Sequence, residues 1–295
     1  MSINIRRIGV IGAGTMGNGI AQTFAGAGYP VIMRDLKPQF LDRGMAAIAK
    51  SLERLTSRGK MTAGDRDATL QRIKPTTELA DLADCDIVIE AILEKCDLKA
   101  ALIQDLDGTC RPDAIFATNT SSISVTRIAA ASKAPGRVVG MHFFNPVPLM
   151  QLIEVIRALQ TSDAVCDAVV NLAQSLGKTA RVSKDSYGFV VNRVLIPMIN
   201  EAINCAHEGV ATPEDIDEMM KLGANHPMGP LALADLIGLD IVQEIMETLY
   251  QGFSDPKYRP SPLLKQMCAA GYLGRKTGRG FFAYEKEAAT RPVAA

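Results

Sequence analysis

The first 186 residues alternate short apolar runs with stretches in which apolar residues recur every three or four positions. The second spacing is typical of amphipathic helices, which we expect after residue 17 through Ala25, over 40–58 and over 98–106. The short runs have the length of strands and lie at 8–11, 31–33, 87–89, 115–117, 138–144 and 152–156. Strands that alternate with helices predict an α/β fold with a doubly wound, mainly parallel sheet.

The pattern changes after about residue 186. Residues 190–203 are strongly apolar at helical spacing, and 230–250 predicts one long apolar helix. Thr212 and Pro213 are typical of a helix start, with threonine as N-cap and proline at the first helical position. We find a strand pattern again only at 280–284. We therefore predict two domains, residues 1–186 with the sheet and residues 187–295 as an all-helical domain.

A glycine motif, GAGTMG at 12–17, follows the first predicted strand and opens the first helix. Gly12 permits a tight turn, Gly14 lets a pyrophosphate approach the helix N-terminus, and Gly17 allows close packing of helix on strand. Asp35 ends the second strand about 20 residues further on, where a ribose hydroxyl would bind. The combination predicts a Rossmann-type dinucleotide site. The alternatives are a glycine turn without a nucleotide, and an Asp35 that caps a helix.

Asp35 also bears on the choice of dinucleotide. A carboxylate at this position would repel the 2′-phosphate of NADP, so NAD is favoured. Arg34 and Lys37 flank Asp35 and could neutralise that phosphate, so NADP stays open.

A histidine and a glutamate stand out among apolar residues. His142 lies at the end of a predicted strand, where ligands of open α/β sheets bind, and histidine suits acid–base chemistry near neutral pH. Glu154 interrupts the apolar run 152–156, and a carboxylate there is costly unless it is paired. We expect the two to pair, with Glu154 stabilising the imidazolium form of His142. The alternative is a core histidine and a glutamate at the surface of an edge strand.

Two polar segments could hold a substrate. Residues 119–122, Asn-Thr-Ser-Ser, follow the apolar run 115–117, although one of these serines could instead cap a helix. Asn192 lies at the start of the first helix of the second domain. An amide on an apolar helix face needs a partner, which a ligand between the domains would supply.

Composition narrows the class of protein. The chain has 295 residues, 47% hydrophobic and 22% charged, with 32 basic and 32 acidic side chains. This balance is that of a globular protein and disfavours a dedicated nucleic-acid binder. No apolar run reaches the roughly 18 residues of a membrane helix, and no signal-peptide core precedes the glycines. The six cysteines are scattered and only three histidines are present. We therefore expect reduced thiols, no metal site and a soluble, cytoplasmic protein.

Several stretches, in the same order, resemble the 3-hydroxyacyl-CoA dehydrogenase family over essentially the whole chain. They are GVIGAGTMGNGIAQ, CDIVIEAILE, FATNTSSISVT, GMHFFNPVPLMQLIEVI, GFVVNRVLIPMINEA, KLGANHPMGPLALADLIGLD and LGRKTGRGFF. The likeness is closest to bacterial short-chain members that act on 3-hydroxybutyryl-CoA. It implies the reversible oxidation of an L-3-hydroxyacyl-CoA to the 3-ketoacyl-CoA with reduction of NAD.

The resemblance also implies roles for single residues. The histidine of HFFNP, His142, would be the general base, and Glu154 would orient it. Ser121 and Asn192 would contact the substrate. The cofactor contacts implied by the resemblance are Gly12, Ala13, Gly14, Thr15, Met16, Gly17, Asp35, Glu94, Lys99, Asn145 and Lys276.

For the CoA moiety, the resemblance points to the helix at 40–58, with Ser51, Arg54 and Arg58 as contacts beside Ser121. The alternative is a solvated basic helix face. A homodimer is implied as well, with the apolar helix 230–250 as a candidate surface. One departure is Tyr187, where the family usually has proline.

Two competing functions remain. One is a dehydrogenase of a free hydroxy acid, which would keep His142 and Glu154 without needing CoA. The other is a non-catalytic protein that has recruited the scaffold, which would not need an intact base.

Overall fold

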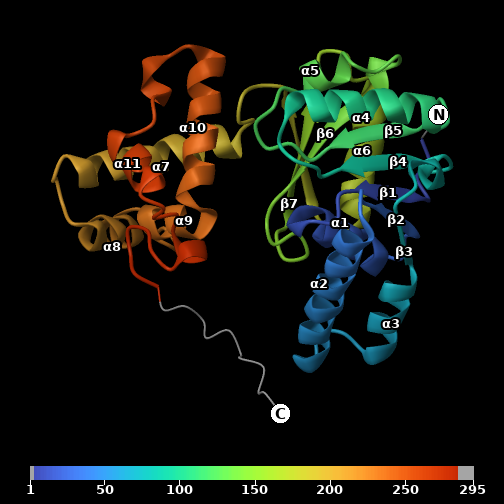
Figure 1. Ribbon diagram of the computed structural model, residues 1–295, viewed down its shortest axis with the longest axis horizontal. Coiled ribbons are helices and arrows are strands. Elements are labelled where there is room, and N and C mark those ends of the chain that lie inside the picture. Colours follow the sequence, from blue (N-terminus) through green and yellow to red (C-terminus); the bar gives the residue numbers. More distant parts are fainter. Residues whose placement is uncertain (1–2, 285–295) are drawn as a thin grey trace. The chain divides into compact units, whose positions relative to one another are not determined.

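The computed structural model describes residues 3–284, which form two compact units, the first ending at Ser186 and the second beginning at Tyr187. Figure 1 shows the sheet in the first unit and a set of helices in the second. Within the described residues no helix is long and apolar enough to cross a membrane. In the same range no group of three or more His, Cys, Asp or Glu side chains could hold a metal ion.

The first unit is built on an eight-stranded sheet of order β3-β2-β1-β4-β5-β6-β7-β8. All neighbouring strands are parallel except β6 and β7, so the predicted doubly wound, mainly parallel sheet is confirmed. The strands are β1 (Ile8–Ile11), β2 (Val31–Arg34), β3 (Ile73–Thr76), β4 (Ile87–Glu90), β5 (Ile115–Thr118), β6 (Val138–Phe143), β7 (Leu152–Arg157) and β8 (Thr179–Lys184).

Helices connect and cover these strands (Figure 1). They are α1 (Thr15–Gly26), α2 (Pro38–Ser57), α3 (Ala63–Gln71), α4 (Cys96–Thr109), α5 (Val125–Ala129) and α6 (Asp163–Ser175), with short 3-10 turns at Leu79–Leu82 and Pro135–Arg137. Helix α2 begins at proline, which is favoured at a first helical position because it lacks an N–H that would have no partner there.

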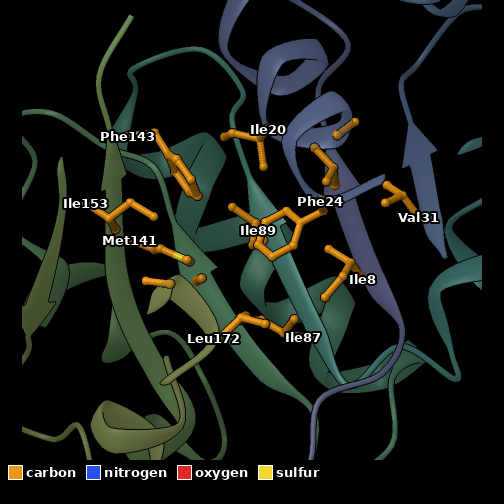
Figure 2. Packing of buried hydrophobic residues seen from close by; sticks show 14 of the residues in the cluster. Ile8, Ile20, Phe24, Val31, Ile87, Ile89, Met141, Phe143, Ile153 and Leu172 are labelled. Carbon is orange, nitrogen blue, oxygen red and sulfur yellow. The ribbon is translucent and has the colours of Figure 1, made fainter. Parts of the chain in front are cut away.

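The core of the first unit lies where these helices pack on the sheet. Figure 2 shows Phe24 of α1 among Ile8 of β1, Ile89 of β4 and other fully buried apolar side chains. Burying each such side chain contributes about 1.5–3 kcal/mol. Phe24 also meets the edge of the Phe143 ring at 6.4 Å between centroids. Since Phe143 directly follows His142, this packing fixes the end of β6 against α1.

The apolar runs did not predict the two edge strands. β3 has the sequence IKPT and contains Pro75, which cannot donate to a sheet and is tolerated at an edge. β8 has the sequence TARVSK and is largely exposed. Edge strands bury less apolar surface than central strands, so their sequences carry a weaker apolar signal. Helices α3 and α6 were missed with them.

The second unit is helical through most of its described length. Its helices are α7 (Val191–His207), α8 (Pro213–Gly223), α9 (Pro230–Ile237), α10 (Leu239–Phe253) and α11 (Pro262–Ala269), with 3-10 turns at Pro256–Tyr258 and Arg275–Thr277. Thr212 caps α8 as predicted, its hydroxyl accepting the Asp215 N–H at 3.2 Å. The core of this unit is formed by apolar side chains from α7, α9 and α10, such as Ile199, Leu231 and Met246.

Two predictions for this unit were wrong. The single helix expected over 230–250 is two helices, because Gly238 has a φ of +106° and breaks the chain between α9 and α10. Residues other than glycine rarely adopt that backbone conformation. The strand expected at 280–284 is not a strand. Near it the chain forms only isolated bridges, from Arg279 to Gly274 and to Ala283.

Candidate active site

The glycine turn joins the end of β1 to the start of α1. Gly12 has a φ of +99°, and a Cβ there would lie 2.5 Å from the carbonyl oxygen of Ala91. A Cβ on Gly17 would lie 1.8 Å from the carbonyl oxygen of Gly12. A Cβ on Gly14 would meet no atom within 4 Å, so the backbone there borders open space. The turn therefore exposes the N-terminus of α1, which fits the pyrophosphate of a dinucleotide.

Asp35 follows β2 and turns back to the glycine turn. Its Oδ2 accepts the backbone N–H of Ala13 at 2.7 Å, and its Oδ1 accepts the N–H of Leu36 at 2.6 Å. The alternative in which Asp35 caps a helix is wrong, because the N-cap of α2 is Lys37. The carboxylate instead lies beside the turn, where each of its oxygens has a second lone pair for a ribose hydroxyl.

His142 and Glu154 are brought together by the antiparallel pairing of β6 and β7, in which they lie directly opposite each other. Nδ1 of His142 is 2.8 Å from Oε2 of Glu154. Their side chains are 7% and 4% exposed, so Glu154 is not the surface residue that the alternative required. β7 is also not an edge strand, since β8 pairs with its other side. A slip of one residue would send the two side chains to opposite faces of the sheet.

The chemistry open to this pair follows from its hydrogen bond. An ionised carboxylate only accepts, so Nδ1 of His142 carries a hydrogen and Nε2 is the basic nitrogen of the neutral ring. The ring of Phe144 lies 4.5 Å from that of His142, between centroids. The pair can therefore take up a proton at Nε2, and the Glu154 carboxylate stabilises the imidazolium that results.

Ser121 lies in a loop in which several N–H and hydroxyl groups donate hydrogen bonds to the carboxylate of Glu94. Oε1 of Glu94 accepts the Thr120 hydroxyl at 2.5 Å and the N–H groups of Ser121 at 2.8 Å and Ser122 at 3.2 Å. The Ser121 hydroxyl lies 3.3 Å from the same oxygen. Burial alone would raise the pKa of Glu94, but the charge of Lys99 and these hydrogen bonds outweigh burial and lower it. The ionised carboxylate thus sets the conformation of the loop.

The serine that caps the next helix is neither Ser121 nor Ser122. The hydroxyl of Ser124 accepts the N–H of Arg127 at 3.2 Å and is the N-cap of α5. The helix-cap alternative for the Asn-Thr-Ser-Ser segment is therefore wrong.

Lys99 lies in a buried network that sequence reasoning missed. Its side chain is 1% exposed, and Nζ donates to both oxygens of Glu90 at 2.9 and 2.8 Å. Nζ also lies 3.3 Å from Oε2 of Glu94, and the Thr118 hydroxyl donates to Glu90. A signal was present, because Glu90 closes the apolar run of β4 and a buried acid needs a partner. Lys99 holds Glu94 in place, and a contact with the cofactor stays a prediction.

The end of β6 is tied to the neighbouring strand by an amide. Oδ1 of Asn119, just after β5, accepts the N–H of Phe143 at 2.9 Å. Asn145 follows two residues later, is exposed, and joins Pro146 through a cis peptide bond. The predicted cofactor contact Asn145 therefore lies in the loop directly after His142.

The expected CoA contacts lie towards the end of α2. Ser51 is half-buried, whereas Arg54 and Arg58 are exposed. Among residues 3–284, neither arginine forms a salt bridge. Their charges are thus available to an anionic ligand, and contacts of these residues with CoA stay a prediction.

Two predicted site residues belong to the second unit. Asn192 is the second residue of α7. Lys276 lies in the 3-10 turn near the end of the described chain, where Nζ is 2.6 Å from a carboxylate oxygen of Asp240. Their contacts with substrate and cofactor stay predictions.

Comparison with known proteins identifies both units. A family model described as the NAD binding domain of 3-hydroxyacyl-CoA dehydrogenase matches residues 7–186, and one described as its C-terminal domain matches residues 188–284. The chain is 55% identical over 278 residues to a probable 3-hydroxybutyryl-CoA dehydrogenase of Deinococcus radiodurans, covering 94% of this chain and 100% of that protein. It is 52% identical over 285 residues to a protein of the same description from Bacillus subtilis, covering 97% and 99%.

Among solved structures, that of (S)-3-hydroxybutyryl-CoA dehydrogenase from Ralstonia eutropha is similar with a TM-score of 0.93 and 54% identity. The match covers 96% of this chain and 100% of that one. The chain therefore belongs to the 3-hydroxyacyl-CoA dehydrogenase family, and its first unit is that family's NAD-binding domain.

Proposed function

We propose that this protein catalyses the reversible NAD-dependent oxidation of (S)-3-hydroxybutyryl-CoA to acetoacetyl-CoA. The observation that carries the proposal is the buried His142–Glu154 pair, in a chain that the family's two domain models match over residues 7–186 and 188–284. The short-chain substrate is taken from the relatives that match over their full length.

In the proposed mechanism His142 acts as the base. Nε2 takes the proton of the 3-hydroxyl group as the C3–H bond breaks, and the Glu154 carboxylate stabilises the imidazolium. In the reverse direction the imidazolium returns that proton to the 3-keto oxygen. NAD, when bound, supplies the acceptor for the hydrogen and electron pair that leave C3. Because oxidation releases a proton overall, alkaline pH favours the ketone.

The cofactor would lie on the glycine turn with its ribose on Asp35. Glu94, Lys99, Asn145 and Lys276 complete the proposed contacts. We favour NAD over NADP because the Asp35 carboxylate would repel a 2′-phosphate. Nε of Arg34 donates to the carbonyl oxygen of Thr77 at 3.2 Å, which commits one of its five donors elsewhere.

The two ends of the substrate would be held by different residues. Ser121 and Asn192 would bind the reacting end, and Ser51, Arg54 and Arg58 would bind the CoA end. Residues from 187 onward would thus contribute to substrate binding as well as to the fold.

We also propose a homodimer formed through the second unit. Most apolar side chains of residues 230–250 are buried in the core of the second unit, so this segment alone is a poor dimer surface. Exposed apolar side chains remain on α8, at Met219 and Leu222, and at Val210 before it. Met219 and Leu222 are three residues apart and share one face of α8, which we propose as part of the interface. We place the enzyme in the cytoplasm, where its six cysteines would stay reduced.

The test is loss of NADH absorbance with acetoacetyl-CoA, then with NADPH in place of NADH, and with free acetoacetate as the control. We expect rapid turnover with NADH and the CoA ester alone. A preference for NADPH would keep the reaction and overturn the role of Asp35. Turnover of a free acid without turnover of the ester would replace the proposal by a free-acid dehydrogenase. Absence of turnover with any of these would favour a non-catalytic role.

A further inference from the structure

One loop, residues 144–151, joins the two strands that carry His142 and Glu154. A buried lysine outside the predicted site holds this loop. Nζ of Lys178 donates to the carbonyl oxygen of Val147 at 2.8 Å and to that of Met150 at 2.7 Å. The two carbonyls are three residues apart, and the N–H groups of Leu149 and Met150 both donate to the carbonyl oxygen of Pro146 at 3.0 Å, so the ammonium binds a hydrogen-bonded turn of the loop.

The backbone determines where this lysine stands. Gly177, with a φ of +70°, ends the helical segment of α6, and the N–H of Lys178 donates to the carbonyl oxygen of Ala173 at 3.3 Å. The next residue, Thr179, donates its N–H to the carbonyl oxygen of Gln151 at 2.8 Å. Lys178 is thereby anchored on both sides, at the start of β8 and beside the start of β7.

The opposite side of the loop packs on α1. A Cβ added to Gly19 would lie 2.9 Å from the Cβ of Val147, so only glycine lets the helix come this close. Gly19 lies two residues after the glycine turn. Val147 is therefore held between the helix that opens the cofactor site and the ammonium of Lys178, and Asn145 lies two residues before it in the same loop.

A lysine is an unusual residue at a buried position. Lys178 is 7% exposed, and among residues 3–284 it forms no salt bridge. Burial lowers the pKa of its amine. A buried charge with only carbonyl partners costs more than an apolar side chain of the same size. The charge of Lys178 instead holds two main-chain carbonyl groups of the loop in place.

We propose that Lys178 is a positioning residue, which fixes the loop so that Asn145 and the His142–Glu154 pair face the bound nicotinamide in reacting geometry. It touches neither substrate nor cofactor and acts through the loop. The inference rests on the proposed function where it is tested by enzyme kinetics. Its test by NADH affinity needs only that the protein binds NADH.

The experiment compares Lys178→Met with Lys184→Met, a matched change at an exposed position on β8. Folded content is followed by circular dichroism, and NADH affinity by the fluorescence of the bound dinucleotide. Steady-state rates with acetoacetyl-CoA give kcat and KM, and NADH deuterated at C4 gives the isotope effect on kcat.

For Lys178→Met we expect weaker NADH binding and a kcat about tenfold lower, because small displacements of reacting groups are costly. The KM for acetoacetyl-CoA should change by less than about twofold, since the CoA contacts are elsewhere. The isotope effect should rise as hydride transfer becomes slower than product release. Lys184→Met should match the native chain in every readout.

Native NADH affinity and kcat in Lys178→Met would overturn the inference. So would a fall in kcat that only follows the folded fraction, with NADH affinity and isotope effect unchanged. If the native chain does not reduce acetoacetyl-CoA, the proposed function fails, while the NADH titration still decides the role of Lys178. Lys178→Gln, which keeps a donor at shorter reach, takes the place of the methionine variant if that one does not fold.

Discussion

The glycine turn and the His142–Glu154 pair, which we propose as two halves of one site, are built in different ways. The turn is local, because six consecutive residues, 12–17, supply its conformation, its close packing and the helix N-terminus behind it. The pair is not local, because His142 and Glu154 meet only through the register of β6 on β7. A motif therefore suffices to recognise the first half, whereas the second depends on the packing and pairing of a whole sheet.

The largest effect should come from the half that depends on strand register. His142→Ala should lower turnover of acetoacetyl-CoA by roughly 10²–10⁴, since proton transfer is lost. NADH binding should stay near native, because the turn does not depend on the imidazole. Turnover close to native in this variant would remove His142 from the mechanism, and loss of NADH binding would show that the two halves are not independent.

Glu154→Gln separates the charge of the pair from its geometry. The amide can still accept the hydrogen at Nδ1 of His142, but it does not stabilise the imidazolium. A hydrogen bond to a charged group is worth about 1.5–3 kcal/mol, which corresponds to about a 10- to 100-fold loss in kcat. Native kcat in this variant would mean that Glu154 only orients the ring.

The local half can be tested with two glycines of α1 and its turn. Gly14 has an ordinary φ of −65° and would gain a Cβ that meets no protein atom, so Gly14→Ala should fold normally. The added methyl would nevertheless obstruct a pyrophosphate, and we expect NADH affinity to fall about tenfold. Gly26→Ala, with equally open space at the other end of α1, is the control. Equal NADH affinities in the two variants would contradict the assignment of the turn.

The smallest effect should come from Glu94, which fixes the loop of Ser121. Its pKa is lowered in the folded chain, so its stabilising contribution is present above the ordinary glutamate value of 4.5 and disappears as the pH falls through the lower folded value. Native protein should exceed Glu94→Gln by about 1 kcal/mol in unfolding free energy near neutral pH. Denaturant unfolding at several pH values measures this gap, which should close in acid. A gap that does not change with pH would argue against an ionised Glu94.

Local patterns predicted the central strands, the glycine turn and the cap at Thr212, because each is set by neighbours in the chain. The pairing of His142 with Glu154 was predicted, because a buried acid needs a partner and the resemblance implies the same pair, and the antiparallel register shows how the two meet. Glu90 and Lys178 were overlooked. The carbonyl partners of Lys178 lie 31 and 28 residues away, and Glu90 meets Lys99, only nine residues on, because α4 packs beside the end of β4. The helix break at Gly238 was missed because apolar periodicity continues across it.

By itself, the sequence determined the class of fold, the position of the dinucleotide turn and the residue types able to do proton chemistry. These depend on backbone conformation and on burial along a single element, which composition and spacing encode. Only the tertiary structure decided which buried charges meet and how the loop between β6 and β7 is held. Such choices depend on the register and packing of segments distant in sequence. A one-residue shift of β7 against β6, for example, would place His142 and Glu154 on opposite faces of the sheet.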